Sequence, residues 1–129
     1  MSMRAGLRKR MADRRQAEAR GHRGEAWAAW WLRLKGHRIL GRRVKTHAGE
    51  IDLITLCPFG PVCFVEVKAR GSARAAAEAV TPEQRTRIAR AASLYLASRP
   101  TLARRGARFD IVTIAGLPRH LPDAWRMDG

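Results

Sequence analysis

The stretch that decides the fold is Gly49-Glu50-Ile51-Asp52-Leu53-Ile54-Thr55-Leu56-Cys57, followed by Pro58-Phe59-Gly60-Pro61 and then Val62-Cys63-Phe64-Val65-Glu66-Val67-Lys68-Ala69. Apolar, β-branched and aromatic residues dominate its two halves, and the Pro-Phe-Gly-Pro segment between them is a strong turn signal. The two halves predict strands at 50–57 and 62–69. A third strand is expected at 38–45, with a turn at 46–49. Such short connections indicate an antiparallel meander.

Helices are expected both before and after this meander in the sequence. Between residues 18 and 35, Trp27, Trp30, Trp31 and Leu34 recur at helical spacing, so we expect them to anchor this helix in the core, and Gly36 is placed to end it. On the other side, 71–79 reads as a loop of small residues. The sequence Thr81-Pro82-Glu83-Gln84 then predicts a capping box that opens a helix at 82–98.

A last strand is expected at 108–114, because a helix of this length between strands favours a crossover to a parallel neighbour. The predicted fold is therefore α/β, in the order α-β-β-β-α-β, with a mixed central sheet flanked by helices. Residues 1–20 are expected to be a basic, flexible segment, 21–114 the folded domain, and 115–129 a tail that packs on the domain or forms an oligomer contact.

The charge of the chain points to an anionic partner. Among 129 residues, 26 Lys and Arg face 11 Asp and Glu, a formal net charge of +15. Nucleic acid or an anionic membrane surface would neutralise such an excess. No apolar run reaches the roughly 18 residues of a membrane-spanning helix, and no secretory signal is visible. Two cysteines are too few for a disulfide framework, so we expect a reduced, cytoplasmic protein.

The positions of the cysteines and histidines in the sequence do not predict a metal site. Cys57 and Cys63 are close enough to face each other across a hairpin, but two ordinary half-buried thiols are the simpler expectation. The four histidines are scattered without the spacing of metal ligands, so no structural zinc site is expected.

Charged residues inside apolar strands are the main candidates for chemistry. Glu66 and Lys68 share one face of their strand, and Asp52 interrupts the apolar run of the preceding strand. Burying such groups is costly unless they are paired or bind a metal. A solvated strand face with a Glu–Lys pair is the structural alternative. Two carboxylates on neighbouring strands suit Mg²⁺, and a nearby lysine suits a metal-activated water.

These residues also carry a family resemblance. The segments Gly49–Ile54 and Phe64–Arg70 resemble the PD-(D/E)xK nuclease signature, although Ile51 rather than proline precedes Asp52. More closely, the chain resembles the YraN family of largely uncharacterised bacterial proteins, which are similar to archaeal-type Holliday-junction resolvases. The match spans roughly residues 21–114 and also includes Gly24-Glu25-x-x-Ala28, Glu78–Thr81 and Arg108–Val112.

The resemblance implies a restriction-endonuclease-like fold and assigns roles to residues. Asp52 and Glu66 would bind Mg²⁺ or Mn²⁺, Lys68 would orient the attacking water, and Glu25 would be an additional acidic ligand from the first helix. Glu25 is also flanked by Ala28, Ala29 and Leu32 at helical spacing, although a glutamate in the first turn of a helix is the alternative reading. Glu50 matches the family pattern, either as a metal ligand or as a partner of an arginine. A lysine usual in the family is replaced by Gln84.

A set of basic residues flanks the proposed site and would contact DNA phosphates with little sequence preference. It comprises Arg42, Arg43, Lys45, Arg70, Arg74, Arg85, Arg87 and Arg90.

The sequence thus predicts a metal-dependent DNA endonuclease, selective for branched or junction-like DNA, in which a homodimer would supply two cuts. The alternatives are a non-catalytic DNA- or RNA-binding protein that keeps the fold, and a basic RNA- or ribosome-associated protein. A membrane-surface role is the least favoured.

Overall fold

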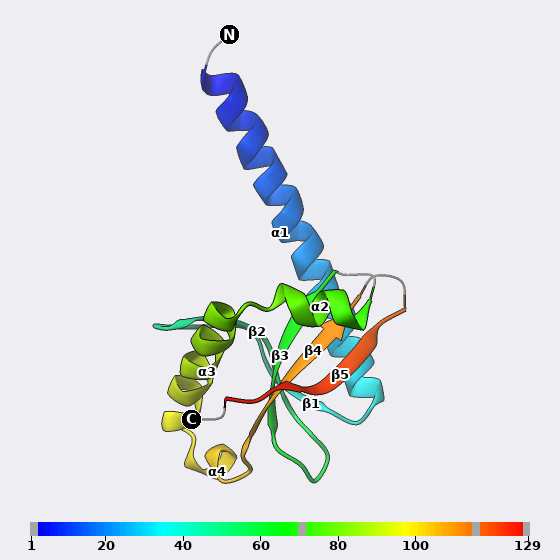
Figure 1. The fold of residues 1–129 in the computed structure, drawn as a ribbon, viewed down its shortest axis with the longest axis vertical. Coiled ribbons are helices and arrows are strands. Elements are labelled where there is room, and N and C mark those ends of the chain that lie inside the picture. Colours follow the sequence, from blue (N-terminus) through cyan, green and yellow to red (C-terminus); the bar gives the residue numbers. More distant parts are fainter. Residues whose placement is uncertain (1–2, 70–71, 115–116, 128–129) are drawn as a thin grey trace.

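The computed structural model describes residues 3–69, 72–114 and 117–127. A five-stranded sheet has the order β1-β2-β3-β4-β5 and lies between α1 on one side and α2 and α3 on the other (Figure 1). The elements are α1 (Met3–Leu34), β1 (Arg38–Thr46), β2 (Gly49–Leu56), β3 (Val62–Lys68), α2 (Ala73–Ala79), α3 (Pro82–Ala97), α4 (Pro100–Ala103), β4 (Ala107–Thr113) and β5 (Arg119–Trp125).

The predicted mixed sheet is confirmed. β1, β2 and β3 pair antiparallel, and β4 joins β3 in parallel, with Val65 beside Asp110. The capping box at α3 is also confirmed, because Thr81 accepts from the Gln84 amide at 3.2 Å and the Gln84 side chain accepts from the Thr81 amide at 3.0 Å. Gln84 therefore has a structural part in this chain.

Four elements depart from the prediction. Residues 73–79, predicted as a loop, form helix α2, whose N-cap Ser72 accepts from the Ala75 amide. In the tail, 119–125 forms β5, an edge strand antiparallel to β4. The short helix α4 was not predicted either. The first helix begins at Met3 rather than near residue 18, and its N-terminal part projects beyond the sheet (Figure 1).

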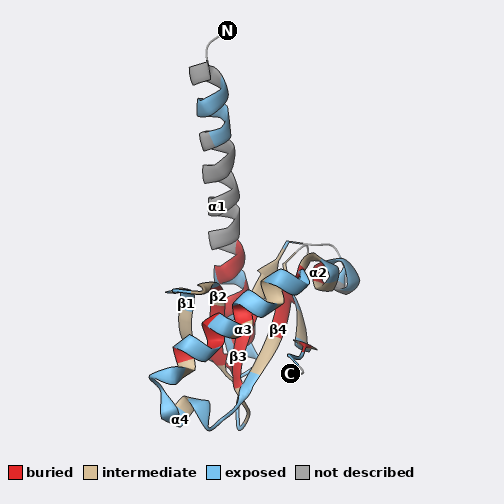
Figure 2. Ribbon diagram, turned by 60° about the vertical axis from the view of Figure 1, so that its left-hand side comes forward, coloured by how far each residue is buried: buried red, intermediate tan, exposed pale blue. Residues whose placement is uncertain are grey.

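The core has two layers, one on each face of the sheet, with buried residues concentrated on the strands (Figure 2). One layer joins Phe64 and Ile54 to Ile88 and Tyr95 of α3. The other joins the buried α1 residues to the opposite face of the strands; its members are Ala28, Ala29, Leu32, Leu53, Cys57, Cys63, Val65 and Val112.

The prediction that the tryptophans of α1 anchor the core is wrong. Trp27 and Trp30 are 57% and 51% exposed, whereas Ala28, Ala29 and Leu32 are at most 1% exposed. The small side chains face the sheet because α1 approaches it closely. A Cβ at Gly24 would lie 2.4 Å from the Ile114 side chain and 3.6 Å from that of Val67.

Candidate acidic site at the end of the β2–β3 ladder

Asp52 lies where the pairing of β2 with β3 stops. The ladder runs from Leu56 beside Val62 to Leu53 beside Val65. Beyond it, one carboxylate oxygen of Asp52 accepts from the Val67 amide at 2.9 Å. This bond holds the two strands at the point where they separate and leaves the second oxygen of Asp52 for another partner. Burial raises the pKa of Asp52, while the Val67 bond acts against that rise.

Glu66 and Lys68 stand on the adjacent part of β3. Lys68 Nζ lies 3.8 Å from Glu66 Oε2, and the side chains are 21% and 12% exposed for Lys68 and Glu66 respectively. Burial and then the charge of Asp52 raise the pKa of Glu66 to about 8, although Lys68 acts in the opposite direction. The Glu–Lys pair therefore belongs to a largely buried group of charges, not to a solvated strand face.

α1 brings Glu25 to the same group. This residue is 7% exposed and follows Gly24, where an added Cβ would lie 2.4 Å from the Ile114 side chain and 3.6 Å from that of Val67 in β3. Its Oε2 is 3.4 Å from Arg43 Nε, and Arg43 lies between Arg42 and Val44, which pair with Leu53 and Ile51 on either side of Asp52. Burial, followed by the charge of Asp52, raises the pKa of Glu25 to about 7, and the Arg43 guanidinium acts against this.

The structure thus brings the four predicted site residues together. The charge of Asp52 raises the pKa of both Glu25 and Glu66, and Lys68 lowers those of Asp52 and Glu66. Glu25 is buried and Asp52 and Glu66 are partly buried, and three such carboxylates that repel one another form a donor set for a hard cation, which prefers carboxylate oxygens and waters. Their oxygens are not all within 4.8 Å of one another, so the fit to Mg²⁺ rests on donor chemistry and charge rather than on preformed ligand geometry.

Glu50 and the predicted phosphate-binding residues lie around this group in different ways. Glu50 is exposed and stands opposite Lys45 in the β1–β2 ladder. Arg42, Arg43, Lys45, Arg74, Arg87 and Arg90 are exposed. Arg74 pairs with Glu78 within α2, at 3.1 Å. Arg70 lies outside the described residues.

Arg85 differs from the other predicted phosphate ligands. Its Nε donates to the Val80 carbonyl at 3.1 Å, Nη2 donates to the Ala77 carbonyl at 3.4 Å, and the guanidinium lies 5.8 Å from the centre of the Trp125 ring. These contacts join the end of α2 to α3 and β5. They give Arg85 a structural part that sequence reasoning did not anticipate.

A second polar cluster, which sequence reasoning missed, lies at the other end of β3. Cys57 and Cys63 are buried rather than half-buried, and their sulfur atoms are 3.4 Å apart beside His37. The signal available in the sequence was the short spacing of the two cysteines across a turn. His37, twenty residues before Cys57, gave no such signal.

The fold and the site define a mixed α/β domain with a buried acidic group and one lysine where the β2–β3 ladder ends. Comparison with known proteins gives the family. The model of the uncharacterised protein family UPF0102 matches residues 24–114, so the chain belongs to that family. No helix within the described residues has the length and apolar character needed to cross a membrane.

Close relatives share most of the chain. It is 51% identical over 118 residues to a UPF0102 protein of Paramagnetospirillum magneticum, covering 87% of this chain and 91% of that protein. A UPF0102 protein of Acidiphilium cryptum is 42% identical over 127 residues, with 98% of each chain covered. One of Parvibaculum lavamentivorans is 50% identical over 108 residues, or 82% of this chain and 80% of that protein.

Proposed function

We propose that the protein is a metal-dependent DNA endonuclease that hydrolyses phosphodiester bonds. The observation that carries the proposal is the buried acidic group of Glu25, Asp52 and Glu66 beside Lys68, in a chain with a net charge of +15. In a strongly basic protein, carboxylates that lie partly or fully buried next to one another repel each other, and a bound cation would offset that repulsion. The rest of the surface of such a protein favours a polyanion.

The three carboxylates would hold Mg²⁺ or Mn²⁺. When bound, such an ion supplies charge neutralisation at the scissile phosphate and acidifies a bound water. Asp52 is held by the Val67 amide, so its free oxygen has a fixed direction. Lys68 is positioned by Glu66 and would orient the attacking water and stabilise developing negative charge. Glu25, which Arg43 contacts, would complete the acidic set from α1.

DNA would be held through its phosphates. The exposed basic residues of β1, namely Arg42, Arg43 and Lys45, lie on the strand next to Asp52, and Arg87 of α3 packs over Gly49 at the β1–β2 turn. Contacts of this kind give affinity without base selectivity. A preference for branched DNA, with a twofold dimer supplying paired cuts, follows from the resemblance to junction resolvases and forms part of this proposal, as does a cytoplasmic location.

Cleavage assays test the proposal directly. Purified protein is incubated with labelled linear, flapped, forked and four-way-junction DNA in Mg²⁺ or Mn²⁺, with EDTA and Lys68→Ala as controls. We expect cleavage that disappears in both controls. Glu66→Gln, which removes one proposed metal ligand, should also abolish cleavage. Its matched control is Glu83→Gln, at an exposed position in the first turn of α3, which should cleave like the wild type.

Binding without cleavage in either metal would contradict the proposal. If that binding also survives EDTA and the Lys68→Ala substitution, the protein is a non-catalytic nucleic-acid-binding module. Competition with RNA would then establish which nucleic acid it prefers.

A further inference from the structure

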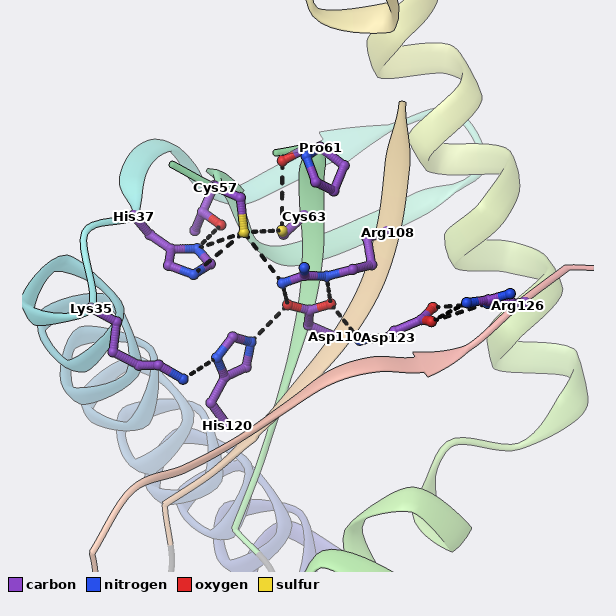
Figure 3. Close-up of polar contacts among 11 residues, drawn as sticks. Lys35, His37, Cys57, Pro61, Cys63, Arg108, Asp110, His120, Asp123 and Arg126 are labelled. Carbon is purple, nitrogen blue, oxygen red and sulfur yellow. Dashed lines mark hydrogen bonds and ion pairs between the residues drawn. The ribbon is translucent and has the colours of Figure 1, made fainter. Parts of the chain in front are cut away.

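We propose that His37, Cys57 and Cys63 form a binding site for a thiophilic divalent cation of the Zn²⁺ type, separate from the acidic site. Figure 3 shows the three side chains converging from three segments of the chain. His37 lies between α1 and β1, Cys57 immediately follows β2, and Cys63 is the second residue of β3. Their ligand atoms all lie within 4.8 Å of one another, and within the described ranges no other group of three His, Cys, Asp or Glu does so.

Two of the distances between these atoms are close to those of a zinc site. With Zn–S bonds of about 2.3 Å and a Zn–N bond of about 2.0 Å, tetrahedral ligands lie about 3.8 Å apart for two sulfurs and about 3.5 Å apart for sulfur and nitrogen. Here the Cys57 and Cys63 sulfurs are 3.4 Å apart, and Cys57 Sγ is 3.6 Å from His37 Nε2. To admit the ion, the two sulfurs would move slightly apart and the His37 ring would rotate.

The hydrogen bonding of His37 leaves one ring nitrogen available to a metal. Its Nδ1 is 2.9 Å from Thr55 Oγ1, a fully buried hydroxyl that can accept the Nδ1 proton. That bond leaves Nε2 as the free ring nitrogen, but Cys57 Sγ lies 3.6 Å from Nε2 and 4.0 Å from Nδ1, beside the ring rather than along the Nε2 lone pair, so the imidazole would rotate to bind an ion. Metal-bound histidines are commonly held in this way, with the second ring nitrogen donating to an oxygen that fixes the ring.

Burial raises the pKa of the Cys63 thiol, and the charge of Arg108 acts against that rise. Arg108 Nη2 donates to Cys57 Sγ at 3.3 Å, while Nε and Nη2 bind the two oxygens of Asp110 at 2.8 Å. Asp110 therefore balances the guanidinium charge, and the Arg108 N–H remains a hydrogen-bond donor to a thiolate. On binding, each thiol releases its proton to solvent, so two thiolates match the charge of the divalent ion.

This site is distinct from the acidic one in place and in ligand preference. Cys63 is near the start of β3, while Glu66 and Lys68 are near its end. Sulfur and imidazole ligands select Zn²⁺ over Mg²⁺, whereas carboxylates favour Mg²⁺. Three protein ligands leave one coordination position for water or an anion. The bound ion would link the α1–β1 junction to the β2–β3 hairpin and so stabilise the fold.

Titration with Co²⁺ tests the inference, because Co²⁺ bound to thiolates has an intense near-ultraviolet charge-transfer band. Reduced full-length protein should develop this band at one ion per chain, keep it in excess Mg²⁺, and lose it when Zn²⁺ is added. Cys57→Ser, Cys63→Ser and His37→Gln should each weaken Co²⁺ and Zn²⁺ binding by about 100-fold or more. Glu66→Gln, which alters only the acidic site, should bind Co²⁺ here as the wild type does.

Folding of each variant is checked by circular dichroism, and Zn²⁺ should raise the melting temperature of the wild type but not that of a folded Cys63→Ser variant. The proposal is overturned if wild type shows no thiolate band, if the band persists in folded cysteine variants, or if mass spectrometry of reduced protein with equimolar Zn²⁺ shows no bound ion. None of these outcomes depends on DNA cleavage, so the site can fail or stand independently of the endonuclease proposal.

Discussion

At the scale of single residues, the acidic site makes the stability of the metal-free protein depend on pH. Burial and Asp52 raise the pKa of Glu25 to about 7 and that of Glu66 to about 8, from ordinary values of 4.5. Between those limits the folded state retains protons that the unfolded state has released. The free energy of unfolding should therefore fall as pH rises from about 4.5 to about 8.

Urea denaturation across this range measures the effect. Glu66→Gln cannot ionise, so it should flatten the decline and stabilise the metal-free protein at pH 8, whereas exposed Glu83→Gln should follow the wild type. Mg²⁺ should stabilise the wild type at pH 8 by binding the folded state alone. Burial lowers the pKa of His37 from 6.5 to about 4, which makes stability rise with pH in that interval, so the test is read above it. A wild-type stability that stays level or rises between pH 6.5 and 8 without metal would show that Glu66 is not protonated in the folded protein.

The pKa of Asp110 is shifted in the opposite direction, so its effect on the pH dependence of stability is also opposite. Asp110 is fully buried, and Arg108, His120 Nε2 and the Asp123 amide all hydrogen-bond to its carboxylate, so that its pKa is held well below its usual range. Its contribution to stability is present above the pKa of the unfolded chain and is lost as pH falls below it. Acid should therefore destabilise this part of the fold.

Removing the Asp110 carboxylate should be costly at neutral pH. Asp110→Ala leaves the Arg108 charge without its partner, and we expect a loss of about 3–5 kcal/mol in denaturant unfolding. Asp123→Asn alters an exposed ion pair with Arg126 and should leave stability nearly unchanged. Equal effects of the two substitutions would mean that the Asp110 network does not stabilise the fold.

At the scale of secondary structure, α1 offers a sharp test of which helix face is buried. Leu32 is fully buried against the sheet, whereas Trp30 is 51% exposed. Leu32→Ala should cost about 2–5 kcal/mol of stability, and Trp30→Ala about 1 kcal/mol or less, although it removes the larger side chain. Thermal or urea unfolding of the two variants would give the reverse order if the tryptophans anchored the core.

The same helix shows where sequence reasoning stops. Periodicity predicts that residues 27–34 are helical, but two apolar stripes share this helix, and nothing in the spacing says which one faces the sheet. Gly24 and the alanines decide it, because a close approach of α1 to β3 excludes large side chains. That packing is a tertiary property, which a local pattern does not contain.

The other missed elements have similar causes. Residues 73–79 are rich in alanine, the strongest helix former, but the stretch is short and lacks an apolar stripe. β5 contains Pro122, which a strand tolerates at the edge of a sheet, where one side needs no ladder bonds. By contrast, alternation along β2 and β3 was sufficient to single out Asp52, Glu66 and Lys68. Their shared burial with Glu25 required the structure.

At the scale of the whole molecule, the net charge of +15 should make DNA binding steeply dependent on salt. The logarithm of the binding constant should fall linearly with that of the salt concentration, with a slope of about −0.9 for each phosphate contact on duplex DNA.

If β1 faces DNA, replacing both Arg42 and Lys45 by glutamine should reduce the magnitude of this slope by about 1.8 and weaken binding to all sequences alike. Arg104→Gln, an exposed position after α4, is the control. Fluorescence anisotropy of labelled DNA in Ca²⁺, at several salt concentrations, measures both the binding constant and its slope with salt. If Arg104→Gln lowers the slope as much per charge as the β1 substitutions do, binding is a property of total charge, and β1 is not the DNA-facing surface.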